Sequence, residues 1–66
     1  MADFTARFLD NWGEPISTVS YPGPLPQAET RALGHVRNVE TNCRRRVYTI
    51  EMLHENQLCS ELTYRA

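Results

Sequence analysis

The clearest hydrophobic pattern in this 66-residue chain is an alternation of apolar and polar residues in its C-terminal third. Two segments rich in β-branched, aromatic and aliphatic residues flank the polar stretch Glu55-Asn56-Gln57, which is typical of an antiparallel hairpin. A loop at these three residues sets Tyr48 opposite Tyr64 and Ile50 opposite Leu62. The apolar side chains of both strands then share one face, so we expect a sheet with one side to bury.

Apolar positions near the N-terminus predict a helix over residues 3–12. Phe4, Phe8, Leu9 and Trp12 follow the spacing i, i+4, i+5 and i+8, which places them on a narrow helical stripe. An isolated helix of about ten residues is marginal in water, so the stripe has to pack on something. We expect it to cover the apolar face of the hairpin. The alternative is that it protrudes and docks into the groove of a partner.

The next part of the chain predicts an early strand followed by a loop. Residues 15–21 are rich in residues that favour strands. Because proline cannot donate a backbone hydrogen bond, either Pro15 is the first residue of this strand or the strand lies at a sheet edge. Residues 22–30 contain three prolines and a glycine within their first five positions, which predicts a loop with polyproline character. Two alternatives stay open, a helical turn over residues 28–31 and a proline-rich ligand for an aromatic groove.

Residues 31–40 carry their apolar side chains at an ambiguous spacing. Leu33, Val36 and Val39 are three positions apart, whereas a strand has a period of two. Either Gly34 marks a bulge that shifts the alternation, or the segment is partly helical. We favour the bulged strand, which would lead through a turn into the C-terminal hairpin.

The predicted fold is therefore α+β in one small domain, with a short N-terminal helix packed on an antiparallel sheet. The sheet would contain the early strand and a three-strand meander over residues 31–65. A chain of this length buries only about 60% of its unfolded surface, so its stability alone is marginal and a partner is a common support. No apolar run approaches the ~20 residues of a membrane span, and the N-terminal residues lack a signal-peptide pattern. We therefore expect a cytoplasmic protein without membrane contact.

The two cysteines are predicted to be free thiols. In the hairpin register Cys59 lies across from Leu53, and Cys43 precedes Leu53 by ten positions, or about 33 Å along a strand. A disulfide requires Cα atoms within about 7 Å. His35 and His54 complete a possible set of zinc ligands with these cysteines, but the Cys-x₂-Cys and His-x₃-His spacings of zinc sites are absent. We predict no metal.

The sequence also lacks an assembled catalytic site. His35 and His54 are the side chains whose ordinary titration falls near neutral pH, and His54 is close to Glu51 and Glu55 in the sequence. A nucleophile and a pocket are needed beside such a base, and so short a chain offers little concavity for a substrate. We expect no enzyme activity and no cofactor.

Charge adds a local feature to this picture. Seven basic and eight acidic side chains give a net charge of −1, which excludes a strong overall attraction to nucleic acid. The arginine run in the last third of the chain is either a strand edge protected against aggregation or a clamp for phosphate or carboxylate groups. The candidate nucleic-acid or anion contacts are Arg37, Arg44, Arg45, Arg46 and Tyr48.

Two short resemblances accompany these patterns. Residues 44–66 look like the closing strands of hotdog-fold thioesterases, which also end in Thr-aromatic-Arg; the central helix and the acidic or asparagine catalytic residues of that family have no counterpart here. Residues 1–4 with Phe8 are similar to the start of small phage head–tail connector proteins, a resemblance over about a dozen residues that implies a virion or connector component. We assign the chain to neither family.

The function that the sequence predicts is a non-catalytic protein-binding or structural module, acting as a homo-oligomer or as a small subunit of a larger assembly. Val47 and Leu53 lie opposite the hairpin face that the helix would cover, so both faces of one strand carry apolar groups. The candidate partner contacts are Phe4, Phe8, Trp12, Val47 and Leu53. The alternative is a small nucleic-acid-binding module that uses an arginine and tyrosine surface.

Overall fold

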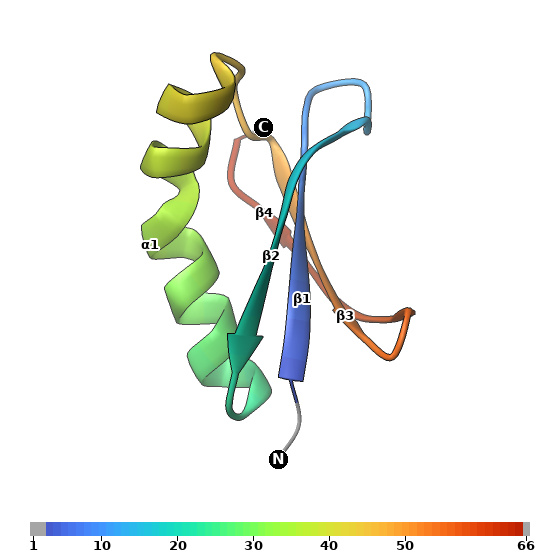
Figure 1. The fold of residues 1–66 in the computed structure, drawn as a ribbon. Helices are drawn as coiled ribbons and strands as arrows, with labels where there is room; N and C mark the ends of the chain where they lie inside the picture. The colour runs from blue at the N-terminus through green and yellow to red at the C-terminus, as the bar shows by residue number, and fades with distance from the viewer. Residues whose placement is uncertain (1–2, 66) are drawn as a thin grey trace.

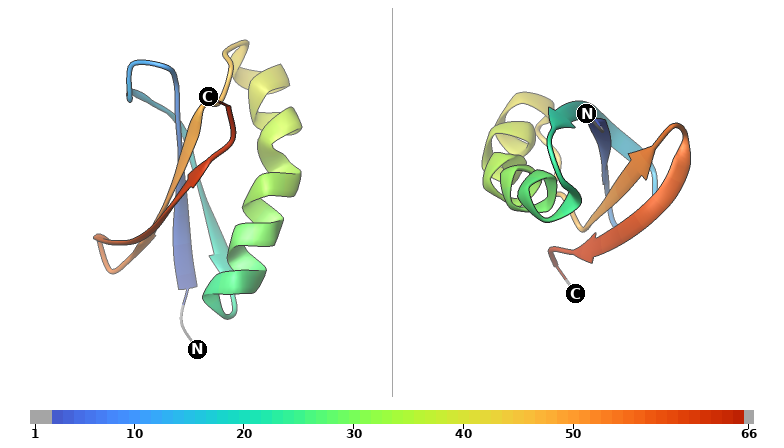
Figure 2. Two further views of the ribbon diagram at one scale, coloured as in Figure 1. Left: turned by 180° about the vertical axis from the view of Figure 1, so that it is seen from behind. Right: turned by 90° about the horizontal axis from the view of Figure 1, so that it is seen from below.

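A computed structural model describes residues 3–65 as one helix and four strands. The elements are β1 (Asp3–Leu9), β2 (Pro15–Pro22), α1 (Leu25–Cys43), β3 (Thr49–His54) and β4 (Gln57–Thr63). The strands form one antiparallel sheet in the order β2-β1-β3-β4, and α1 packs across one face of it (Figures 1 and 2). The predicted α+β class is confirmed. Within residues 3–65 no helix is both long enough and apolar enough to span a membrane.

The N-terminal segment is a central strand, so the prediction of a helix over residues 3–12 is wrong. Phe4, Ala6 and Phe8 alternate along β1 and point into the core, with exposures of 9%, 0% and 0%. The spacing of four between the two phenylalanines fits a strand period of two as well as a helical turn, which is why the pattern misled. Trp12 falls in the loop after β1 and is 78% exposed.

The helix lies in the middle of the chain, where a loop over residues 22–30 and a strand over residues 31–40 were predicted. Both predictions are wrong because α1 begins directly after Pro24. Proline is tolerated in the first helical turn, where its missing N–H has no intrahelical partner anyway. Of the three residues whose spacing suggested a bulge, Val36 and Val39 lie on the buried stripe of α1, whereas Leu33 is exposed. The buried residues of α1 are Ala28, Ala32, Val36 and Val39.

The C-terminal hairpin and the early strand confirm the sequence prediction. Ile50 stands opposite Leu62, and beyond the paired strands the amide of Tyr64 donates to the carbonyl of Tyr48 at 2.9 Å. α1 covers the face that carries Ile50, in the place where the helix over residues 3–12 was expected. The early strand, β2, begins at Pro15 and lies at the edge of the sheet.

The hairpin turn is one residue shorter than predicted. Glu55 and Asn56 form it with positive φ angles of 52° and 66°, the combination that a two-residue hairpin of matching twist requires. A register shift near the turn then pairs Leu53 with Leu58. The predicted pairing of Leu53 with Cys59 is therefore wrong.

The core lies between α1 and the sheet, and the residues before β3 contribute to it. Val47 is fully buried among the core side chains, although the extrapolated strand pattern placed it on the opposite face. The strand begins only at Thr49, so its alternation does not extend back to Val47. Cys43 and Cys59 are both free, which confirms that prediction.

Candidate functional site

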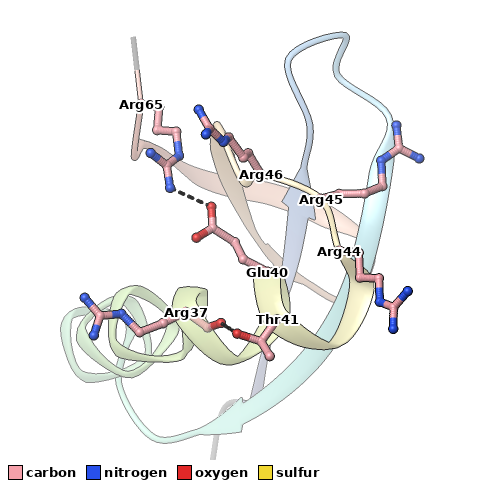
Figure 3. Close-up of a pocket in the computed structure, with 7 residues that line it drawn as sticks. All are labelled: Arg37, Glu40, Thr41, Arg44, Arg45, Arg46 and Arg65. Atoms are coloured by element: carbon pink, nitrogen blue, oxygen red, sulfur yellow. Dashed lines mark hydrogen bonds and ion pairs between the residues drawn. The ribbon is translucent and has the colours of Figure 1, made fainter.

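The strongest concentration of charge lies where the end of α1, the α1–β3 connection and the end of the chain meet (Figure 3). Side chains from these segments surround an open hollow of about 400 Å³. The residues that line it are Arg37, Glu40, Thr41, Arg44, Arg45, Arg46 and Arg65. Five of the seven basic side chains in the sequence therefore gather at one end of the molecule. We call these five residues the arginine cluster.

The C-terminal end of α1 places the first residues of the arginine run. Arg44 ends the helix in the left-handed conformation, with φ 56° and ψ 38°. This conformation turns the chain sharply, so that Arg45 and Arg46 cross the end of the helix before β3 begins. Glycine is the usual residue in this conformation, and an L-residue there costs about 1 kcal/mol. A strained arginine, with its side chain exposed, is therefore part of the cluster.

Glu40 joins three segments at the hollow. Its Oε2 atom accepts hydrogen bonds from a guanidinium nitrogen of Arg65 at 2.8 Å and from the amide of Val47 at 2.9 Å. The hydrogen bond from Arg65 is the main cause that lowers the pKa of Glu40, followed by the bond from the Val47 amide. The charge of Arg46 lowers it further. Glu40 therefore fixes the positions of α1, the start of β3 and the chain end relative to one another.

Asp10 connects the cluster to the β1–β2 loop. One carboxylate oxygen accepts a hydrogen bond from Arg45 at 2.5 Å, and the other accepts from the amides of Trp12 and Glu14 at 2.9 Å each. Asp10 itself is only 4% exposed. The hydrogen bond from the Glu14 amide is the largest cause that lowers the pKa of this carboxyl, and the charge of Arg45 acts in the same direction.

Within residues 3–65, three arginines of the cluster make no ion pair. Among residues 3–65, Arg45 pairs with Asp10 and Arg65 with Glu40, whereas no carboxylate pairs with the others. The unpaired members are Arg37, Arg44 and Arg46, and all three are exposed. The nearby end of α1 carries about half a negative charge, which three full positive charges exceed. This end of the molecule can therefore attract an anion.

Aromatic side chains border the same end. Tyr64 is 42% exposed, and the guanidinium of Arg65 lies 5.4 Å from the centre of its ring. Tyr48, which the sequence proposed as a contact, is only half-buried, and its amide donates to the carbonyl of Leu9 at 2.9 Å. Trp12 was not predicted to belong to this surface. The sequence signal was the Asp-Asn-Trp-Gly run, because aspartate and glycine at these positions are typical of a tight turn.

The proposed partner contacts are mostly inside the protein. Phe4, Phe8 and Val47 lie in the core, and Leu53 is 8% exposed. Of these five candidates, Trp12 alone presents a largely exposed side chain.

The remaining candidate residues are scattered. The ring of His35 packs 6.4 Å from that of Phe8, whereas His54 packs 5.3 Å from Phe4 nearer the opposite end of the sheet. Within residues 3–65 no three histidine, cysteine, aspartate or glutamate side chains are placed to hold a metal ion. The arginine cluster is thus the one concentration of chemically active groups that the described part of the chain assembles.

Comparison of the chain with protein-family models, with curated proteins and with solved structures gives no match. The chemistry of the arginine cluster is therefore the basis for a functional proposal.

The lowered pKa values of Asp10 and Glu40 predict acid sensitivity. A carboxyl with a depressed folded-state pKa stabilises the protein above its ordinary pKa of about 4, and this stabilisation is lost as pH falls through the folded-state value. We expect the melting temperature to decrease as the pH is lowered below about 4. The double variant Asp10→Asn/Glu40→Gln should have a lower melting temperature at neutral pH. Its melting temperature should also decrease less between neutral and acid pH.

A matched control for this experiment is Glu55→Gln, because that carboxylate is 85% exposed at the hairpin turn. Thermal melts followed by circular dichroism over the acid range compare the three proteins. An acid fall as steep in the double variant as in the wild type would show that other groups cause it.

Proposed function

We propose that this protein is a non-catalytic, cytoplasmic nucleic-acid-binding module whose arginine cluster contacts backbone phosphates. The observation that carries the proposal is that Arg37, Arg44 and Arg46 all line one open hollow. They are exposed, have no carboxylate partners in residues 3–65, and spread their guanidinium groups in different directions around it (Figure 3). A guanidinium presents a planar fork of donors that matches phosphate oxygens, and it carries its charge at every physiological pH.

A chain of phosphates fits this hollow better than a small ligand does. Small-molecule sites usually enclose most of their ligand in a largely apolar cavity, whereas this hollow is open and its lining is almost entirely charged. The lining offers no cysteine or histidine as a nucleophile or base, which supports a binding role over catalysis. Arginines spread around one hollow can engage different phosphates of one strand.

The remaining charges of the protein favour a single orientation on such a ligand. Glu40 lines the hollow and Asp10 pairs with Arg45 beside it, so the other six of the eight acidic side chains lie outside the cluster, together with only two arginines. Phosphates are therefore attracted to the end that carries the arginine cluster and repelled by the rest of the surface. A net charge of −1 is compatible with nucleic-acid binding because the positive charge is concentrated at one end.

Arg44→Gly tests the proposal because its effects on stability and on binding should have opposite signs. Glycine relieves the left-handed conformation of Arg44, so we expect a gain of about 1 kcal/mol in the free energy of unfolding. Affinity for a single-stranded oligonucleotide should fall about tenfold near 50 mM salt, and the slope of log affinity against log salt should flatten by about 0.7. Melting curves and fluorescence-anisotropy titrations measure the two effects.

The control is Arg31→Gln, which removes one exposed arginine from an earlier turn of α1. Arg31→Gln should change the salt slope and the affinity less than Arg44→Gly does. Wild-type protein without salt-dependent binding, or an Arg44→Gly variant that binds as the wild type does at every salt concentration, would refute the proposal.

A second candidate function, as a homo-oligomer or a subunit of a larger assembly, is favoured by strand β4. This strand lies at the edge of the sheet, pairs on one side only, and exposes 52% of Leu58. Edge strands can be extended by a strand from another chain. Sedimentation velocity over a range of protein concentrations tests this function: a concentration-dependent dimer supports it, and a monomer throughout argues against it.

A further inference from the structure

The β1–β2 loop presents the most exposed large apolar side chain among residues 3–65. Trp12 is 78% exposed, compared with 52% for Leu58 and 42% for each of Leu33 and Tyr64. An indole ring that stays in water lacks the large favourable free energy that its burial would give. Contact between the Trp12 ring and a ligand would therefore be favourable, because it would remove apolar surface from water.

The loop holds Trp12 in a defined position. Within the loop, the amides of Trp12 and Glu14 donate to the Asp10 carboxylate, that of Gly13 donates to the Asp10 carbonyl at 3.1 Å, and that of Asp10 donates to the Glu14 carbonyl at 3.0 Å. Gly13 supplies the positive φ of 79° that the turn needs. A loop ordered before binding loses little conformational entropy when a ligand arrives.

The same carboxylate ties the loop to the arginine cluster. Asp10 accepts hydrogen bonds from both Arg45 and the amide of Trp12, so one side chain joins the two segments. The loop lies at the same end of the molecule as the end of α1 and the C-terminal residues (Figures 1 and 2). A ligand whose phosphates contact the cluster can therefore reach the indole ring.

The surroundings of Trp12 favour a nucleic-acid base over a protein as the covering group. Its neighbours in the loop are Asn11, Gly13 and Glu14, all exposed and none apolar. Energetically important residues of protein interfaces usually lie inside a ring of other contacts that exclude water. Of the other exposed apolar residues, Leu33 and Leu58 belong to α1 and to the start of β4, and Tyr64 follows β4 beside Arg65 of the arginine cluster. Trp12 instead belongs to the loop that Asp10 joins to Arg45 of the arginine cluster.

We infer that Trp12 stacks on a base and thereby makes the arginine cluster selective for single-stranded over double-stranded nucleic acid. This inference rests on the proposed function, because the phosphate contacts deliver the strand to the ring. Each base of a single strand offers a π-face, and aromatic stacking is tolerant of sequence. In a duplex the bases are already stacked on one another, so the ring reaches no free face without unstacking a step.

The experiment uses the intrinsic fluorescence of Trp12, which is the only tryptophan in the chain. The probes are an oligothymidylate and a duplex of the same length, titrated at equal ionic strength. We expect the single strand to quench the fluorescence and to bind more tightly than the duplex. Trp12→Ala should weaken single-strand binding by roughly 5- to 150-fold and leave the salt slope unchanged. Duplex affinity should hardly change.

Leu33→Ala is the matched control, because it truncates another exposed apolar side chain away from the loop. Wild-type protein that binds in a salt-dependent way, with Trp12→Ala binding equally well, would overturn the stacking inference and leave the proposed function standing. Absence of salt-dependent binding by the wild type would overturn both. Self-association that is lost in Trp12→Ala would assign the ring to a protein contact and also overturn the inference.

Discussion

Replacing Arg37, Arg44 and Arg46 together by glutamine is expected to lower affinity for a single-stranded oligonucleotide by several hundred-fold near 50 mM salt. Each phosphate contact adds about 0.7 to the slope of log affinity against log salt, which amounts to about tenfold at that ionic strength relative to 1 M. Loss of three contacts should flatten the slope by about 2. Anisotropy titrations at several salt concentrations measure both quantities.

The control for the triple variant is Arg7→Gln/Arg31→Gln, which removes charge outside the cluster. Arg31 is exposed on α1, and Arg7 makes a 3.5 Å ion pair with Glu51 at a partly exposed site, which contributes little to stability. Net charge alone would make affinity fall in proportion to the arginines removed in both variants. Equal losses per charge removed would contradict a specific role for the cluster.

Phe8→Ala is expected to unfold the protein or to leave it barely folded. Phe8 is fully buried on the central strand β1, and truncation of such a side chain costs about 3–5 kcal/mol. Natural domains have a free energy of unfolding of about 5–15 kcal/mol, and short chains lie toward the lower end. Each lost kcal/mol lowers the melting temperature of so small a domain by about 4–8 °C. Thermal melts followed by circular dichroism measure the change.

Trp12→Ala is the informative comparison for Phe8→Ala, since it truncates an aromatic side chain that is 78% exposed. An exposed substitution of this kind should change stability by no more than about 0.5 kcal/mol. On the helical stripe that the sequence suggested, Phe8 and Trp12 would have shared one buried face. Similar losses of stability in the two variants would therefore contradict the strand assignment of β1 and the loop position of Trp12.

The parts of the fold that could be predicted are those in which one periodicity fits the sequence. The C-terminal hairpin alternates up to Met52, and its polar turn separates two strands of similar length, so the pairing of Ile50 with Leu62 followed directly. Pro15 likewise restricted β2 to a position that the sheet confirms. The structure of these two elements follows from the residues within them, and packing against the rest of the chain does not change it.

The helix was missed because its signals were weak or equivocal. Prolines before and within its first turn resemble a break, although proline is well accepted there. Ala28 and Ala32 are fully buried, yet so small an apolar side chain adds little to a hydrophobic pattern. At the N-terminus, Phe4 and Phe8 fit two periods, and only the neighbouring strands on both sides of β1 decide between them.

The candidate site could be predicted only in part. The run from Arg44 to Arg46 is visible in the sequence, and Arg37 was expected nearby, although on a strand instead of α1. Asp10 and Arg65 approach this run only through the fold, across 35 and about 20 positions of sequence. The sequence therefore showed a charged segment, whereas the fold distinguishes the arginines held by carboxylates from those that pair with no carboxylate of residues 3–65.

The most direct test is to map a short single-stranded oligonucleotide onto the protein by NMR chemical-shift perturbation at low ionic strength. The arginine-cluster proposal predicts changes in residues 10–14, 37–47 and 64–65, including the side-chain signals of Arg44, Arg46 and the Trp12 indole. These changes should fade as salt is added. Perturbations confined to the open face of the sheet around Arg7 and Glu51, or no perturbation at any salt concentration, would contradict it.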